Sequence, residues 1–272
     1  MENFFEISDL SCGYKDKFFI SEIDISISKG SFVGIIGPNG SGKTTLFRGI
    51  TGDLKIKSGS ICLEGKNLKQ FSYKERARNI AIVSQDIDNP DITVEDYVLM
   101  GRLPYHTQYQ FFDSANDIAV AEKYMNLTSI THLRNTLLSQ LSGGERQMAD
   151  ITRALVQEPK LLLLDEPTSH LDIALQVQIL NLVQQLNREL GLTVLMIIHD
   201  LNLAGEYCDR LILLKKGHIH HQGTPEEVLT YTNIEDVYGT VVFTQPNPLS
   251  GRPAIFLVSG RILNSIKGRN PV

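Results

Sequence analysis

Alternating and continuous runs of apolar residues divide the chain into predicted strands and helices. Ile23, Ile25 and Ile27 alternate with polar residues, which is the pattern of a strand with one buried face. Residues 161–164 and 194–198 are instead continuous apolar runs of strand length, as expected for parallel strands that are covered on both faces. Together these two patterns predict an α/β protein.

Between Thr93 and about residue 135, the apolar residues have helical periodicity and do not form the patterns of strands. Thr93 is a favourable N-cap, and acidic residues follow it in the first predicted turn. We expect a mostly helical insert here, interrupted by a loop over residues 101–113. Tyr105 and Tyr109 of that loop form a partner surface if they are exposed, or else they pack locally.

The composition is that of an ordinary globular protein: 42% of the 272 residues are hydrophobic and 21% are charged. No apolar run approaches the roughly 18 residues that span a bilayer, and the first residues lack the pattern of a signal peptide. The three cysteines are far apart, which favours reduced thiols over disulfides or a zinc site. The net charge of −5 argues against a nucleic-acid binder, and we expect a chain that stays in the cytoplasm.

A glycine-rich loop lies between the apolar run at residues 32–36 and a predicted helix. Its sequence, G-P-N-G-S-G-K-T over residues 37–44, has the G-x-x-x-x-G-K-[ST] pattern of a loop that binds phosphate. Glycines let the backbone curl so that its N–H groups point into one hollow, and the following helix directs its positive end to the same place. Lys43 adds a charge for the outer phosphates, and the Thr44 hydroxyl is a ligand for Mg²⁺. The predicted nucleotide-binding residues are Gly37, Pro38, Asn39, Gly40, Ser41, Gly42, Lys43, Thr44 and Thr45.

Two adjacent carboxylates, Asp165 and Glu166, follow the continuous apolar run at residues 161–164. Because a parallel strand of this kind ends at the ligand-facing edge of its sheet, a binding site explains these acids better than a surface turn does. Asp165 suits the coordination shell of Mg²⁺. Glu166 suits a carboxylate that polarises the attacking water.

A predicted helix begins at Ser142 with two glycines in its first turn. Ser142 and Glu145 have the spacing of a capping box. Gly143 and Gly144 are poor helix formers, so either they are incidental to the cap or their N–H groups approach an anion at the positive helix end. The phosphate loop in the same chain favours the second alternative.

Three further residues have both a structural and a functional interpretation. Tyr14 is an edge-strand aromatic or a stacking surface for adenine. Gln85 is a capping amide or a ligand-facing residue at a strand end, and His199 is a structural histidine or a donor to a γ-phosphate. His218 and His220 would share one face of a short strand, but no third ligand for a metal ion can be recognised. We therefore expect the three histidines within residues 218–221 to be surface residues and not a metal site.

These motifs occur in an order that resembles the ATP-binding subunit of ABC transporters over about residues 1–240. The L-S-G-G-E sequence at residues 141–145 is diagnostic of ABC ATPases among phosphate-loop proteins. The resemblance implies a phosphate-loop NTPase core of the α/β class with a mixed sheet and an antiparallel β subdomain on the N-terminal side. It also implies a helical insert at approximately residues 90–158 and a short C-terminal extension at residues 241–272.

The resemblance assigns roles to individual residues. Tyr14 would stack on adenine, Gln85 would belong to the Q-loop, residues 169–172 would form the D-loop, and His199 would be the switch histidine. The implied catalytic residues are Glu166, His199, Gln85 and Lys43, and the implied Mg²⁺ ligands are Thr44, Gln85 and Asp165. The implied nucleotide contacts outside the phosphate loop are Tyr14, Ser142, Gly143, Gly144, Glu145 and Asp172.

A narrower resemblance concerns the cargo. Residues 97–105 are similar to the V-x-x-G-R-x-P-[YH] stretch of importers for iron-siderophores, haem and vitamin B12. The alternatives are an importer of another type (zinc, manganese or molybdate), an exporter, a soluble non-transport ABC ATPase of DNA repair or translation, and a nucleotide sensor without hydrolysis. A single cassette without a long heptad run or C-x-x-C hook argues against the soluble ATPases, and Glu166 with His199 argues against a sensor. Asp150 and Ile151 depart from the family pattern, and we expect them to affect helix packing.

The family implies ATP and Mg²⁺ as cofactors and a homodimer of ATPase subunits. The two predicted anion sites suggest the same arrangement. One ATP can bind both the phosphate loop and the helix start at Ser142 if it lies between two chains. Two integral-membrane permease subunits and an extracytoplasmic substrate-binding protein complete the implied complex, without nucleic acid. The chain would then be a peripheral subunit on the cytoplasmic face of the cell (inner) membrane, with the permease seated near residues 101–109.

Overall fold

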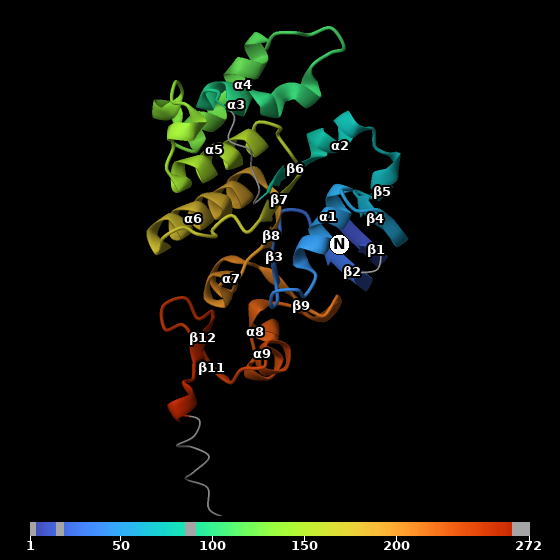
Figure 1. Cartoon of the computed structure of the whole chain (residues 1–272), viewed down its shortest axis with the longest axis vertical. Helices are drawn as coiled ribbons and strands as arrows, with labels where there is room; N and C mark the ends of the chain where they lie inside the picture. The colour runs from blue at the N-terminus through green and yellow to red at the C-terminus, as the bar shows by residue number, and fades with distance from the viewer. Residues whose placement is uncertain (1–3, 15–18, 85–90, 263–272) are drawn as a thin grey trace, which may run out of the picture.

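The computed structural model of the chain describes residues 4–14, 19–84 and 91–262 (Figure 1). Its central feature is a six-stranded sheet, in which the strands from β9 to β6 pair in parallel and β10 pairs antiparallel with β9. The strand order is β10 (His218–Gly223), β9 (Arg210–Lys215), β3 (Phe32–Ile36), β8 (Thr193–Ile197), β7 (Leu161–Asp165) and β6 (Ile80–Val83). The predicted mixed sheet is confirmed.

A smaller antiparallel sheet packs against one face of the central sheet. Its strand order is β2 (Phe19–Ile27), β1 (Phe5–Gly13), β4 (Ile56–Leu63) and β5 (Lys66–Asn67). Leu161 and Leu163 of β7 share a core with this sheet and with α1 (Lys43–Thr51), whereas Leu162 and Leu164 share a core with the helices on the opposite face. Burial on both faces explains the continuous apolar run of β7, and the predicted antiparallel subdomain is confirmed.

Helices cover the second face and form one end of the molecule, drawn in green in Figure 1. That end contains α3 (Val94–Leu99), η2 (Met100–Tyr105), α4 (Ala115–Leu127), η3 (Thr131–Leu133), η4 (Leu138–Gln140) and α5 (Gly143–Leu155). The remaining helices are η1 (Leu68–Gln70), α2 (Tyr73–Asn79), α6 (Ile173–Leu190), α7 (Leu201–Tyr207), α8 (Pro225–Val228) and α9 (Tyr231–Tyr238). Over the residues that the structure describes, no helix combines the length and the hydropathy that crossing a bilayer requires.

A polar network is buried between α3 and α5. The Tyr97 hydroxyl donates a hydrogen bond to Asp150 Oδ1 at 2.6 Å, and Arg146 Nε lies 3.3 Å from the same oxygen. Asp150 is 1% exposed, and burial raises its pKa. Its neighbour Ile151 is fully buried. Both residues therefore contribute to helix packing, as expected from the sequence.

The prediction of a loop over residues 101–113 is wrong for its first part, because η2 is a 3₁₀-helix over Met100–Tyr105. Arg102 of this helix is 2% exposed, and its Nη1 donates to the Val156 carbonyl oxygen at 2.6 Å. Its guanidinium carbon lies 3.9 Å from the centroid of the Tyr105 ring, and the Tyr105 hydroxyl donates to the Gln157 carbonyl oxygen at 2.8 Å. Arg102 and Tyr105 therefore hold the insert together, and neither is free to form a partner surface.

A two-stranded hairpin forms the end of the molecule opposite the helical insert, drawn in red in Figure 1. It consists of β11 (Val242–Pro246) and β12 (Pro253–Leu257), which pair in antiparallel register from Val242 with Leu257 to Pro246 with Pro253. The hairpin lies within the C-terminal extension expected at residues 241–272, of which residues 263–272 lie outside the described part.

Candidate functional site

The phosphate loop joins β3 to α1, in the order of strand, loop and helix. Gly37, Gly40 and Gly42 have positive φ angles of 149°, 75° and 112°, which glycine adopts without strain. A Cβ atom on Gly37 would lie 2.5 Å from the Leu214 carbonyl oxygen and 2.7 Å from Ser41 Oγ, so no larger residue fits there. Ser41 Oγ is buried without a hydrogen-bond partner, and an anion oxygen would satisfy it.

Lys43 is the first residue of α1 and is 5% exposed. Its Nζ donates to the carbonyl oxygens of Gly37 and Pro38 at 2.8 and 3.2 Å, so the ammonium lies over the loop. Burial lowers the pKa of Lys43, and the charges of Glu166 and Asp165 oppose this effect. The hollow beside the loop is lined by Asn39, Gly40, Gly42, Lys43, Thr44, Thr45 and Glu166. The structure thus brings the predicted loop residues and Glu166 to one place.

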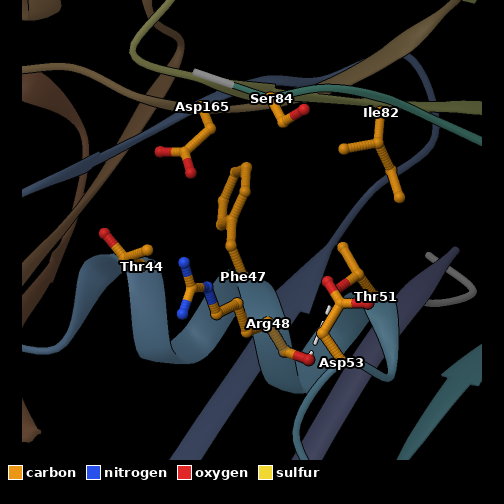
Figure 2. A pocket seen from close by; sticks show the side chains of 8 residues that line it. All are labelled: Thr44, Phe47, Arg48, Thr51, Asp53, Ile82, Ser84 and Asp165. Carbon is orange, nitrogen blue, oxygen red and sulfur yellow. Dashed lines mark hydrogen bonds between the residues drawn. The ribbon is translucent and has the colours of Figure 1, made fainter. Parts of the chain in front are cut away.

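A second hollow, which shares Thr44 with the first, includes the predicted magnesium ligands Thr44 and Asp165 (Figure 2). Asp165 Oδ1 is buried and has no hydrogen-bond partner. Burial raises the pKa of Asp165 to about 6, and the neighbouring charge of Glu166 adds to the rise. A carboxylate that has one buried oxygen without a partner, in the same hollow as a threonine hydroxyl, fits Mg²⁺, which prefers oxygen ligands.

Glu166 and His199 form a hydrogen-bonded pair at the edge of the central sheet. Strands β7 and β8 pair so that Asp165 lies opposite Ile197, which places the residues that follow each strand next to each other. His199 Nε2 lies 2.5 Å from Glu166 Oε1, and the Ser169 hydroxyl donates to Glu166 Oε2 at 3.1 Å. Both carboxylate oxygens therefore have a partner, which fixes the carboxylate beside the phosphate loop.

The start of α5 has the predicted capping box. Ser142 accepts from the Glu145 backbone N–H, and Glu145 Oε2 accepts from the Ser142 backbone N–H at 2.8 Å. Gly143 is exposed, but Gly144 is buried, and a Cβ atom on Gly144 would lie 2.8 Å from a methyl carbon of Leu175 in α6. Close packing against α6 therefore accounts for Gly144. In the described part of the chain, no residue of α5 lines either hollow at the phosphate loop.

Three further residues were predicted to contact the nucleotide or its metal ion: Tyr14, Asp172 and Gln85. The Tyr14 hydroxyl accepts a hydrogen bond from Arg48 Nη1 at 2.6 Å, so Tyr14 is linked to α1. Asp172 is the N-cap of α6 and accepts from the Leu175 backbone N–H at 2.9 Å. Gln85 lies outside the described residues.

Arg48 is a site residue that the sequence reasoning missed. It lines the hollow of Figure 2 together with Asp165, and its positive charge opposes the larger effects of burial and Glu166 on the Asp165 pKa. Arg48 follows Thr44 by four residues in α1, so both lie on one face of the helix. This spacing is the signal by which Arg48 could have been found.

The histidines of β10 stay surface residues in the structure. His218 and His221 are exposed. The group of described residues that does bring three potential ligand atoms within 4.8 Å is His106, Asp113 and Asp117 in the helical insert. Asp117 of this group already accepts hydrogen bonds from Arg102 and from the Ser114 hydroxyl, which satisfies its charge.

A glycine-rich turn that opens a helix, beside a carboxylate at the end of a strand, is the means by which phosphate-loop NTPases hold a nucleotide and its metal ion. Fold and site together place the chain in that class. The family profile described as ABC transporter matches residues 20–169, more than half of the chain, and the chain therefore belongs to the ABC transporter ATP-binding family. Membership makes it a nucleotide-binding ATPase whose hydrolysis is coupled to transport.

Curated relatives extend the match over most of the chain. The chain is 39% identical over 247 residues to the ferric enterobactin transport ATP-binding protein FepC of Escherichia coli (strain K12), covering 90% of the chain and 91% of FepC. It is 37% identical to the probable siderophore transport system ATP-binding protein YusV of Bacillus subtilis (strain 168), covering 90% of the chain and 89% of YusV. It spans only 56% of the uncharacterized ABC transporter ATP-binding protein YvrA of Bacillus subtilis (strain 168), at 39% identity over 91% of the chain.

Solved structures give the same fold. An ABC transporter assigned to the metal-chelate type, in an inward-facing conformation, superposes with a TM-score of 0.84 at 27% identity, covering 96% of this chain and all of that chain. A dimeric post-hydrolysis state of the ATP-binding cassette MJ0796, bound to ADP and Pi, superposes with a TM-score of 0.70 at 27% identity. That match covers 81% of this chain and 98% of that chain.

Proposed function

We propose that this chain is the ATP-hydrolysing subunit of an importer for an iron chelate of the siderophore type. The observation that carries the hydrolytic role is the 2.5 Å contact between His199 and Glu166 beside the phosphate loop. The names of the relatives support the cargo class, because they include ferric enterobactin and siderophore transport proteins. Haem and vitamin B12 belong to the same proposed cargo range, and zinc, manganese or molybdate importers are the alternatives.

The proposed mechanism uses positioning and charge. Lys43 and the loop N–H groups hold the phosphates, and Glu166 orients the attacking water while His199 donates to the γ-phosphate. Thr44 and Asp165 would hold Mg²⁺, which would supply positive charge to the phosphates. Gln85, which follows the end of β6 by two residues in the sequence, is the third proposed ligand, and as the Q-loop residue it would link the nucleotide to the helical insert. Tyr14, whose hydroxyl accepts from Arg48, is the proposed stacking surface for adenine.

The proposed functional unit is a head-to-tail homodimer with ATP between the chains. Ser142 and Gly143 are exposed at the start of α5 and line neither hollow at their own phosphate loop, so this positive helix end is available to a nucleotide on a second chain. Glu145 maintains this helix start through the capping box, and Asp172 lies at the start of the neighbouring helix. The dimeric MJ0796 cassette, bound to ADP and Pi, supports this arrangement by its fold.

Gel filtration with multi-angle light scattering tests the dimer. The Glu166→Gln protein with Mg-ATP is expected to elute as a dimer, because ATP binds but is not consumed. The same protein with ADP is expected to be monomeric. A Glu166→Gln protein that stays monomeric at saturating Mg-ATP argues against the shared nucleotide site.

The proposed complex places the chain as a peripheral subunit on the cytoplasmic face of the inner membrane. Two permease subunits would contact the helical insert, where Met100, Leu103 and Tyr109 are 44%, 53% and 80% exposed. An extracytoplasmic substrate-binding protein would deliver the cargo, and no nucleic acid takes part. Residues 1–240 would act as one ATPase domain, with residues 241–272 as its extension. Copurification of the permease, followed by identification of the cargo of its binding protein, tests the cargo class.

A further inference from the structure

The C-terminal hairpin is attached to the helix that follows His199. Asn202, in the first turn of α7, exchanges two hydrogen bonds with the backbone of Ile255 in β12. The Ile255 N–H donates to Asn202 Oδ1 at 2.7 Å, and Asn202 Nδ2 donates to the Ile255 carbonyl oxygen at 3.3 Å. The side chain of Asn202 thus pairs with β12 as a neighbouring strand would.

The hairpin also contacts the middle and the end of α7. A Cβ atom on Gly205 would lie 2.9 Å from the Pro253 carbonyl oxygen, so the backbone of β12 lies directly against the helix. Arg252 Nη1 donates to the Cys208 carbonyl oxygen at 3.3 Å, just beyond the end of α7. These contacts fix the helix along its whole length.

His199 lies in the short segment between the central sheet and α7. On one side, the Ile198 N–H donates to the Ile35 carbonyl oxygen at 3.1 Å, which holds the end of β8. On the other side, Asp200 is the N-cap of α7 and accepts from the backbone N–H groups of Asn202 and Leu203 at 2.8 and 3.0 Å. The backbone of His199 therefore takes its position from the sheet and from α7.

We propose that the hairpin is a positioning element for His199 and that Asn202 is the residue through which it acts. By fixing the first turn of α7, Asn202 keeps the imidazole within 2.5 Å of Glu166. The inference rests on the proposed function, because it assigns the position of His199 to a catalytic task. It gives the C-terminal extension a role in hydrolysis, although no residue of the hairpin lines the two hollows at the phosphate loop.

ATP turnover of the full chain tests the proposal in two backgrounds. Asn202→Ala is expected to lower kcat roughly tenfold while KM for ATP changes less than about twofold, because it misplaces a catalytic group without touching the nucleotide loop. Asn202→Asp keeps the acceptor of the 2.7 Å bond and is expected to restore most of kcat. In a His199→Ala background, Asn202→Ala is expected to cause no further loss.

A matched control acts at the other end of the same helix. Asn181→Ala removes the acceptor of the Tyr207 hydroxyl bond, 2.9 Å long, and is expected to leave kcat unchanged. Proton NMR gives a readout that does not depend on turnover: the imidazole N–H resonance of His199, assigned by its loss in His199→Ala, should move in Asn202→Ala and stay in place in Asn181→Ala.

The outcomes separate this inference from the proposed function. If His199→Ala retains full kcat, the catalytic role of His199 fails, and the inference fails with it. If His199→Ala is impaired but Asn202→Ala lowers kcat by the same factor in both backgrounds, the hydrolytic role stands and the positioning role is overturned. An unchanged His199 resonance in Asn202→Ala, or an equal kcat loss in Asn181→Ala, also overturns it.

Discussion

Arg102 Nε lies 3.0 Å from Asp117 Oδ1 in the interior of the helical insert. The two side chains are 2% and 5% exposed. Arg102 also donates to the Val156 carbonyl oxygen, and Asp117 Oδ2 accepts from the Ser114 hydroxyl at 2.6 Å. Each charge therefore satisfies the other at a place where an unpaired charge would be very unfavourable.

Arg102→Met is expected to lower the free energy of unfolding by about 3–5 kcal/mol, because it leaves Asp117 buried without its partner. Urea denaturation measures the loss. Arg134→Met is the matched control: Arg134 lies 3.5 Å from both Glu95 and Glu122 with a third of its side chain exposed, so we expect about 0–1 kcal/mol. Equal losses in the two variants would contradict the structural role of Arg102.

The same ion pair predicts a dependence of stability on pH. Burial alone would raise the pKa of Asp117, but hydrogen bonds from Ser114 and Arg102 outweigh it and hold the pKa at about 2. The ordinary pKa of an aspartate side chain is 3.8, so the folded state binds the proton less tightly than the unfolded state. Asp117 therefore stabilises the fold above pH 4, and this contribution is lost as the pH falls towards 2. Asp117→Asn should flatten the fall in unfolding free energy over this range, whereas Asp236→Asn on the exposed face of α9 should leave it unchanged.

Glu166→Gln is expected to lower kcat for ATP hydrolysis by about 10²–10⁴-fold, the range that a positioned general base contributes. Lys43→Ala should weaken nucleotide binding as well, because it removes a buried charge from the loop. Phosphate release and nucleotide binding, measured on the same preparations, distinguish the two effects. Glu235→Gln on α9 removes an exposed carboxylate far along the chain and serves as the control. Undiminished turnover in Glu166→Gln would rule out the proposed catalytic site.

Substitutions on the exposed part of the helical insert should separate transport from hydrolysis. Leu103→Ser and Tyr109→Ala change side chains that are 53% and 80% exposed, so they are expected to abolish uptake while ATP hydrolysis stays within about twofold. Tyr231→Ala on α9 removes a 61% exposed aromatic and should leave uptake unchanged. Uptake into proteoliposomes and phosphate release measure the two quantities, and a parallel loss of both would refute a docking role. Arg102 is unsuitable for this test, because its substitution affects folding.

The sequence was sufficient for features that depend on local spacing. The phosphate loop, the capping box at Ser142 and the apolar run of β7 each occupy consecutive residues, and backbone geometry or burial on two faces requires the residue types found there. The apolar runs predicted the α/β class, whereas the mixed sheet and the antiparallel subdomain were predicted from the resemblance of the motifs to those of ABC ATPases.

Long-range contacts could not be predicted in the same way. Arg102 sits among aromatic and polar residues that suggest a surface loop, and its partners Asp117, Val156 and Glu158 are 15 to 56 positions further along the chain. Similarly, the contact between Glu166 and His199 depends on the pairing of β7 with β8, which only the folded sheet specifies. The sequence identifies residues that can form such contacts, but the fold determines which of them pair.

The bonds between Asn202 and β12 use only main-chain groups of Ile255. Evolution can therefore replace the side chains of β12 without altering the bonds of this strand to Asn202, provided that the strand keeps its shape. Extensions of very different composition could serve the same purpose in other ATPases, and a comparison of their sequences would miss the equivalence. A comparison of these ATPases should therefore begin with the residue at the position of Asn202 in α7.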